Sequence, residues 1–176
     1  MHVELKTQRL LLRPLELADL EAVHAYASDR ENTRFMLFLP NDTLEKTAAF
    51  LKSVEAGWAG EQPQAFEFAV VLGGEVIGAV SVALNDERTE GEMGWILNKR
   101  YWGKGYTTEA ALAVRDFAIR ELGVKKLIAH CDARNTASQR VMQKLSFRLE
   151  GETDDRVYPK TGEKATERMY SLRVAD

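Results

Sequence analysis

The spacing of apolar side chains predicts short strands and amphipathic helices along the chain. Leu20, Val23 and Ala27 recur at helical spacing, and Val114 and Phe117 belong to a longer stripe of the same period. Shorter runs rich in Val, Ile, Phe and Trp favour strands. The expected elements are strand 8–13, helices 18–28 and 43–57, strands 66–72, 76–84 and 92–98, helix 105–122, strand 126–131, helix 136–145, and strands 147–152 and 166–173.

The connections between these segments indicate a mostly antiparallel sheet. Gly73-Gly74 separates two strands and is a tight hairpin signal, and the polar stretch 85–91 makes the next turn. No repeat, low-complexity segment or linker divides the 176 residues. The sequence therefore predicts a single domain over residues 1–176. Its class is α+β, with a mixed, mostly antiparallel central sheet flanked by helices.

Composition narrows the classes of function. The formal net charge of −3 argues against nucleic acid as the main partner. No apolar run approaches the roughly 20 residues of a membrane span, and the polar N-terminal stretch is not typical of a signal peptide. Cys131 is the one cysteine, and His2, His24 and His130 lack metal-ligand spacing. We therefore expect a cytoplasmic protein with no metal, membrane or nucleic-acid partner.

Residues 98–109 carry the first chemical signal. They join a predicted strand to the longest helix, and Gly103 and Gly105 leave backbone N–H groups free to face an anion at the helix N-terminus. The same segment contains three cations: Lys99, Arg100 and Lys104. Thr108 stands where a dinucleotide fingerprint needs its third glycine, and no P-loop spacing follows. A pyrophosphate site and a plain glycine-rich turn both fit this segment.

A second segment, residues 135–147, opens another helix after a strand. Asn135 can present its amide to a ligand backbone, and Ser138 lies one turn further on the same side. Thr136 and Gln139 also satisfy a capping box, so these residues alone fit a plain helix start equally well.

Together, about 30 residues apart, the two segments resemble the coenzyme A motifs of the GNAT superfamily of N-acetyltransferases. Arg100-x-x-Gly103-x-Gly105 matches the superfamily's pyrophosphate motif Gln/Arg-x-x-Gly-x-Gly/Ala, and residues 135–147 match its second coenzyme A motif. Residues 7–14, Thr-Gln-Arg-Leu-Leu-Leu-Arg-Pro, are similar to the RimJ/RimL-type branch, which includes acetyltransferases of ribosomal-protein N-termini. The resemblance covers nearly the whole chain.

The resemblance implies acetyl-coenzyme A as co-substrate and a V-shaped opening between strands 92–98 and 126–131. The pantetheine arm is expected along the first of these strands, with the thioester carbonyl at the N–H of Ile96 or Leu97. The pyrophosphate is expected on the N–H groups of residues 101–106. The residues implied in cofactor binding are Ile96, Leu97, Asn98, Arg100, Gly103, Lys104, Gly105, Tyr106, Thr107, Asn135 and Ser138.

For the base that deprotonates the amine, the resemblance points to Glu92, acting directly or through a water. Glu90 and Glu67 are weaker candidates. Neither a serine nor Cys131 has a histidine placed to activate it, so direct attack in a ternary complex is expected rather than a covalent acyl-enzyme.

For the acid, many members of the superfamily use a tyrosine seven residues after the motif asparagine. Met142 occupies that position here and cannot donate a proton. This departure points to Ser138, which matches a serine of the RimL-like branch and is expected to hydrogen-bond the departing sulfur. Tyr158 and Tyr170 are alternatives, and Trp95 is expected in packing or in a pocket wall.

The sequence thus predicts an N-acetyltransferase acting on a primary amine, either a protein N-terminus or a small amine. A non-catalytic sensor of acetyl-coenzyme A is the alternative, and the chain is expected to be a monomer or homodimer. The acceptor is expected to depend on residues 30–65 and on the late strand loop. Ser146 stands where the related motif has glycine, so we also expect it in the left-handed region.

Overall fold

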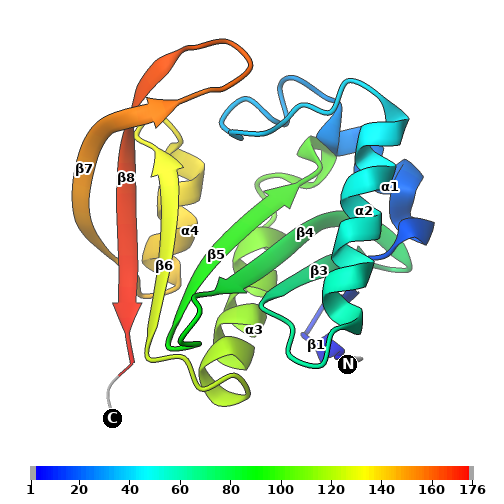
Figure 1. Cartoon of the computed structure of the whole chain (residues 1–176), viewed down its shortest axis with the longest axis horizontal. Helices are drawn as coiled ribbons and strands as arrows, with labels where there is room; N and C mark the ends of the chain where they lie inside the picture. Colours follow the sequence, from blue (N-terminus) through cyan, green and yellow to red (C-terminus); the bar gives the residue numbers. More distant parts are fainter. Residues whose placement is uncertain (1–2, 175–176) are drawn as a thin grey trace.

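The computed structural model describes residues 3–174, which form one eight-stranded sheet with helices packed on it (Figure 1). The strand order is β1-β2-β3-β4-β5-β6-β8-β7. The strands are β1 (Leu5–Lys6), β2 (Leu11–Pro14), β3 (Ala65–Leu72), β4 (Glu75–Leu84), β5 (Glu90–Leu97), β6 (Lys126–Asp132), β7 (Arg148–Val157) and β8 (Lys164–Arg173). The helices are α1 (Leu20–Ala27), α2 (Leu44–Ala59), α3 (Tyr106–Arg120) and α4 (Thr136–Lys144), with 3-10 turns η1 (Leu17–Asp19) and η2 (Lys99–Tyr101).

All neighbouring strands are antiparallel except β5 and β6, which confirms the mixed α+β class. The hairpin predicted at Gly73-Gly74 is present, because Leu72 pairs with Glu75 across the turn. The apolar pattern of the sequence did not predict β1, and it predicted β7 and β8 to be shorter than they are. In β7 every residue but Arg156 is exposed, so this strand carries no apolar alternation.

Strands β5 and β6 lie side by side only at their start. Their parallel pairing begins at Glu90 and Lys126 and ends at Glu92 and Ile128, although β5 continues to Leu97. Beyond that point the two strands diverge, and β6 stays with β8 (Figure 1). This confirms the expected V-shaped opening and places Glu92 at its closed end.

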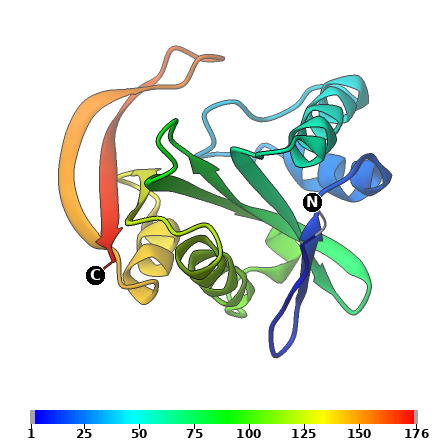
Figure 2. The same cartoon turned by 60° about the horizontal axis from the view of Figure 1, so that its bottom comes forward.

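The two faces of the sheet carry different helices. Helices α3 and α4 lie on one side, and α1 and α2 lie on the other (Figure 2). Val80 and Val82 of β4 belong to the core cluster that contains Val114 of α3. Ala79 lies in a second cluster with Leu51 of α2, as the alternation of side chains along a strand requires. Between residues 3 and 174, no helix is long and apolar enough to cross a membrane.

Candidate active site

Glu92 and His130 form a pair at the closed end of the opening. His130 lies on β6, two residues beyond Ile128, and its Nδ1 is 2.9 Å from Oε1 of Glu92. The hydrogen bond from His130 lowers the pKa of Glu92, and the same contact raises the pKa of His130. The Glu92 side chain is 54% exposed, so an incoming molecule can reach it. Sequence analysis singled out Glu92 but gave His130 no role, because the partner lies on a different strand.

Ser138 is joined to β5 by Trp95. The indole Nε1–H of Trp95 donates to Oγ of Ser138 at 3.1 Å, from β5 to the first turn of α4. An indole N–H can only donate, so the hydroxyl of Ser138 keeps its own proton for another acceptor. The sequence suggested packing or a pocket wall for Trp95 and missed this contact. Met142, at the position of the superfamily's usual tyrosine, is fully buried in the core.

The glycine segment presents a row of free backbone donors. The N–H groups of Tyr101 and Trp102 are bonded to the carbonyls of Asn98 and Lys99. Within the described residues, the N–H groups of residues 103–108 donate to no protein acceptor. Gly103 and Gly105 have φ values of 75° and 80°, which side chains disfavour. The free donors therefore begin two residues later than the expected range, 101–106, and run into the first turn of α3.

The N-terminal segment clamps this loop to α3. The backbone N–H and Nε of Arg9 donate to the carboxylate of Glu109 at 2.8 and 2.6 Å, and Nη1 of Arg9 donates to the carbonyl of Lys104 at 3.1 Å. The hydroxyl of Thr7 donates to the same carboxylate at 2.6 Å. The guanidinium of Arg9 also lies 4.4 Å from the ring centre of Tyr106. Sequence analysis noted the Thr7 to Arg9 pattern but not this structural role.

One of the three cations expected at the anion site is used elsewhere. The ammonium of Lys99 pairs with Asp29 at 2.7 Å and with Glu31 at 2.9 Å. Among residues 3–174, Arg100 and Lys104 take part in no ion pair. These two side chains are therefore the cations of this segment that remain available to an anion.

The hydrogen bonds of β5 restrict where an extended ligand can pair with it. The N–H of Asn98 donates to the carbonyl of Ile77 at 2.8 Å, so backbone groups at even positions of β5 point toward β4. The backbone of Ile96 therefore belongs to the β4 ladder, whereas Trp95 and Leu97 face the opening. The structure argues against the N–H of Ile96 as a thioester donor, and the N–H of Leu97 remains the prediction.

The end of β5 is fixed by side chains from outside the sheet. The carbonyl of Leu97 accepts from Nδ2 of Asn32 at 3.1 Å and from Nε1 of Trp102 at 2.8 Å. The Oδ1 of Asn32 accepts the N–H of Lys99 at 2.6 Å. The Oδ1 of Asn98 accepts the N–H of Arg100, so the Asn98 side chain caps η2. Asn32 thus links the loop after α1 to the wide end of the opening.

Asn135 begins α4, and its side chain has a local partner. Its Oδ1 accepts the N–H of Ser138 at 3.1 Å, so Asn135 is the N-cap and the expected capping box at Thr136 and Gln139 is wrong. Gln139 instead donates to the carbonyl of Ala133. Capping uses the oxygen of the Asn135 amide and leaves its N–H₂ group for a ligand.

The two weaker carboxylate candidates lie away from the closed end. Glu90 is at the start of β5, where its carboxylate is 3.6 Å from the ammonium of Lys126. Glu67 lies on β3 beside Ser81 of β4, and burial raises its pKa to about 7 against the opposing effect of the Ser81 hydrogen bond. Neither residue has a contact with the Glu92–His130 pair.

Both alternative tyrosines donate to other groups. The hydroxyl of Tyr158 donates to Oδ2 of Asp132 at 2.7 Å, and that of Tyr170 lies 3.5 Å from Oε1 of Gln139. Both rings are buried. Of the acid candidates, Ser138 is thus the one whose donor proton has no protein acceptor in the described chain.

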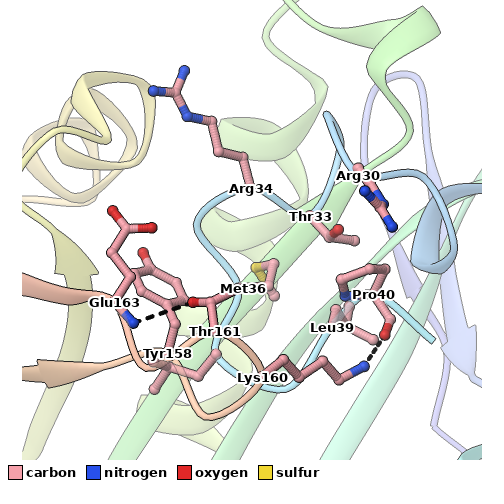
Figure 3. Close-up of a pocket in the computed structure, with 11 residues that line it drawn as sticks. Arg30, Thr33, Arg34, Met36, Leu39, Pro40, Tyr158, Lys160, Thr161 and Glu163 are labelled. Atoms are coloured by element: carbon pink, nitrogen blue, oxygen red, sulfur yellow. Dashed lines mark hydrogen bonds between the residues drawn. The ribbon is translucent and has the colours of Figure 1, made fainter. Parts of the chain in front are cut away.

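A cavity of about 170 Å³ lies between the loop after α1 and the β7–β8 hairpin (Figure 3). Met36 and Leu39 of the loop and Tyr158 and Thr161 of the hairpin contribute to its wall. The loop bearing Phe35 is held to the hairpin by Arg156, whose Nη2 donates to the Phe35 carbonyl at 2.8 Å. No cluster of three or more potential metal ligands occurs in residues 3–174.

Residues 9–148 match the protein family described as "Acetyltransferase (GNAT) domain". The chain is 34% identical over 155 residues to the uncharacterized N-acetyltransferase YnaD of Bacillus subtilis, covering 86% of this chain and 85% of that protein. It is 30% identical over 143 residues to the spermidine N(1)-acetyltransferase of Escherichia coli, covering 80% and 74% of the two chains.

The fold is also that of a solved acetyltransferase. The structure of RimL, a ribosomal L7/L12 alpha-N-protein acetyltransferase in complex with coenzyme A, superposes with a TM-score of 0.86. The superposition covers 98% of each chain, at 18% sequence identity. At this identity the comparison shows that the two proteins share a fold.

Proposed function

Since the chain belongs to the GNAT acetyltransferase family, in its RimJ/RimL-like branch, we propose that it moves the acetyl group of acetyl-coenzyme A to a primary amine by direct attack in a ternary complex. The observation that carries the proposal is the opening between β5 and β6. Free backbone donors lie beyond its β5 side, and a carboxylate–imidazole pair lies at its closed end.

The residues around the glycine segment suit a pyrophosphate. The open backbone at Gly103 and Gly105 and the α3 N-terminus supply N–H donors for its oxygens. Arg100 and Lys104, which form no ion pair within residues 3–174, supply positive charge. A Cβ at Gly103 would meet no atom within 4 Å, so this position has open space beside it. The backbone of Leu97 and the N–H₂ group of Asn135 would bind the pantetheine arm on either side of the opening.

The Glu92–His130 pair would accept the proton of the amine. An α-amino group has a pKa of about 8 and a lysine amine about 10.4, so the acceptor arrives mainly protonated near pH 7. Glu92 takes the proton directly or through a water, and His130 orients the carboxylate. The amine nitrogen then attacks the thioester carbonyl, whose oxyanion would be stabilised by the N–H of Leu97. One such donor typically contributes about 3 kcal/mol.

Ser138 would stabilise the leaving sulfur. Trp95 donates to its oxygen, which leaves the hydroxyl proton to hydrogen-bond the coenzyme A thiolate as the tetrahedral intermediate collapses. The proton that finally reaches the thiol comes from solvent or from the amine, because a serine hydroxyl is a weak acid in water.

Two types of acceptor fit this direct attack by an amine. One is a protein N-terminus, as for RimL, and the other is a small amine, as for the spermidine acetyltransferase. The non-catalytic sensor is the alternative. The free N–H groups serve binding equally in both, so the Glu92–His130 pair is the feature that favours turnover.

The deciding experiment measures thiol release from acetyl-coenzyme A, in EDTA, over a panel of amines and short peptides. We expect release with at least one acceptor and a fall of about 10²–10⁴ in kcat for Glu92→Gln. Glu90→Gln is the matched control and should keep the wild-type rate. Binding of acetyl-coenzyme A without release from any acceptor would favour the sensor instead, and a fully active Glu92→Gln protein would remove Glu92 from the mechanism.

A further inference from the structure

The cavity beside the β7–β8 hairpin has an unusual balance of charge for this chain. Its wall carries three cations, Arg30, Arg34 and Lys160, and one carboxylate, Glu163. That is an excess of two positive charges in a chain with a formal net charge of −3. An anion would therefore be attracted to this cavity and a polycation repelled from it.

The carboxylates around the cavity do not neutralise these cations. Glu163 pairs with Arg134 at 2.9 Å, and the charge of Asp132 behind it offsets that of Arg134. Within residues 3–174, Arg30 and Arg34 form no ion pair. Asp132 and Arg134 thus cancel behind the cavity, whereas Asp29 and Glu31, on either side of Arg30 in the chain, carry one negative charge more than their partner Lys99. These two carboxylates reduce the positive excess at the cavity without removing it.

The three cations differ in how they face the cavity. Lys160 donates to the carbonyl of Pro40, and Figure 3 places Arg30 beside the same proline. The guanidinium of Arg34 extends away from the other labelled residues and lies 5.0 Å from the ring centre of Phe35, so Arg34 contributes its charge from the rim. The Asp42 carboxylate feels both Lys160 and Arg30, but its main partner is Lys46 at 2.9 Å. The Pro40 carbonyl carries no charge, so the charge of Lys160 is offset only in part, by an Asp42 carboxylate that is also paired with Lys46.

The cavity lies close to the proposed reaction centre. Tyr158 in its wall donates to Asp132, and Asp132 is two residues from His130 on the same face of β6. Two residues of a strand span about 7 Å. The loop that forms the other wall is tied to the end of β5 by Asn32, so the cavity spans the wide end of the opening.

We infer that this cavity receives an anionic group of the acceptor, so that the preferred substrate is a primary amine carrying a carboxylate or phosphate several ångströms from its nitrogen. This rests on the proposed function. A cavity with this preference would favour a peptide N-terminus followed closely by an acidic or phosphorylated side chain, and it would disfavour a polyamine such as spermidine.

The test compares four peptide amides, Ser-Ala-Xaa-Ala, with Xaa as Asp, phosphoserine, Asn or Lys, beside spermidine. The amidated ends leave Xaa as the one variable charge. We expect kcat/KM to fall from the acidic peptides through Asn to Lys, by about tenfold in total at about 0.01 M ionic strength and by less at 0.15 M. The Asp and phosphoserine arms distinguish a carboxylate from a phosphate.

Variants assign the preference to the cavity. Arg30→Gln with Arg34→Gln should abolish most of it, and both side chains are exposed, so folding should survive. Arg120→Gln, an exposed arginine at the far end of α3, is the matched control and should leave the preference intact. Spermidine or the Lys peptide as the better acceptor, or an unchanged preference in the double variant, would overturn the inference while leaving the acetyltransferase standing.

Calorimetry of the same peptides with the coenzyme A-bound protein makes the test independent of turnover. If the Asp peptide binds more tightly than the Lys peptide but gives no thiol release in the assay with acetyl-coenzyme A, the result would support the anion site and count against the proposed function. Equal binding of the Asp and Lys peptides would reject the anion site, whatever the turnover.

Discussion

At the residue scale, Glu67 shows that surroundings rather than residue type set the chemistry of a side chain. It is half-buried on β3, where burial raises its pKa to about 7 and the hydroxyl of Ser81 donates to it. Burial raises the pKa of Tyr26, a buried residue of α1, and the charge of Glu67 raises it further. Ionising this carboxyl in the folded protein is therefore costly.

The contribution of Glu67 to the stability of the fold should consequently fall as pH rises from about 4.5 to about 7. In that window the folded state holds the Glu67 proton more tightly than the unfolded state, so folding is favoured at the acid end and loses that contribution as pH reaches about 7. Glu67→Gln removes the ionisation and keeps an acceptor for Ser81. We expect it to stabilise the protein by roughly 1–3 kcal/mol at pH 8 and to have little effect near pH 4.5.

Urea denaturation of both proteins across this pH range measures the difference. Glu61→Gln, at an exposed position, is the matched control. A stability difference that stayed constant with pH would mean that Glu67 does not titrate in this window.

At the scale of the element, the end of α4 confirms an expectation drawn from one residue. Ser146 has φ of 68°. Its N–H donates to the carbonyl of Gln143 and the N–H of Phe147 to that of Met142, which is the Schellman pattern of bonds. The motif spacing alone was enough to place this turn, because a helix that must return Phe147 to the core has few ways to end.

We expect Ser146→Gly to stabilise the protein by some tenths to about 1 kcal/mol. Serine holds the left-handed conformation against its Cβ at roughly 1 kcal/mol, and part of the gain is lost because glycine also frees the unfolded chain. Ser53→Gly within α2 is the control and should destabilise by up to about 1 kcal/mol. A lower denaturation midpoint for Ser146→Gly at equal slope would contradict the strain argument, and activity should be unchanged.

At the scale of the molecule, the sequence predicted what depends on local pattern and missed what depends on long-range contacts. Apolar periodicity located α2, α3 and the β3–β5 meander, and two motif segments located the glycine loop and the α4 start. The Glu92–His130 pair and the Trp95–Ser138 contact join different elements. The spacing of residues within one segment carries no information about such contacts between segments. In the sequence, a single charged residue is indistinguishable from one on a solvated face, and a single aromatic residue from one in the core.

Arg156 is the clearest case of this kind. It is 7% exposed on an otherwise exposed strand, so its charge gives no sign of burial in the sequence. Its Nη1 donates to Glu167 at 2.7 Å, its Nε to Tyr158 at 3.3 Å, and its Nη2 to the carbonyl of Phe35 at 2.8 Å. One guanidinium thus joins β7, β8 and the loop after α1, which form the cavity at the wide end of the opening.

We therefore expect Arg156→Met to destabilise the protein by about 2–4 kcal/mol, because Glu167 and the Phe35 carbonyl lose their buried partner. Arg156→Lys should destabilise the protein by less than Arg156→Met, since an ammonium cannot bond both groups with the geometry of a planar fork.

The loop that loses its contact with Arg156 bears the acceptor cavity and not the glycine segment. The Michaelis constant for the amine should then rise severalfold in Arg156→Lys, while that for acetyl-coenzyme A stays near the wild-type value. Arg148→Lys, exposed on the same strand, controls for the loss of a guanidinium. Equal changes in both constants would mean that Arg156 supports the whole fold and does not position the acceptor loop.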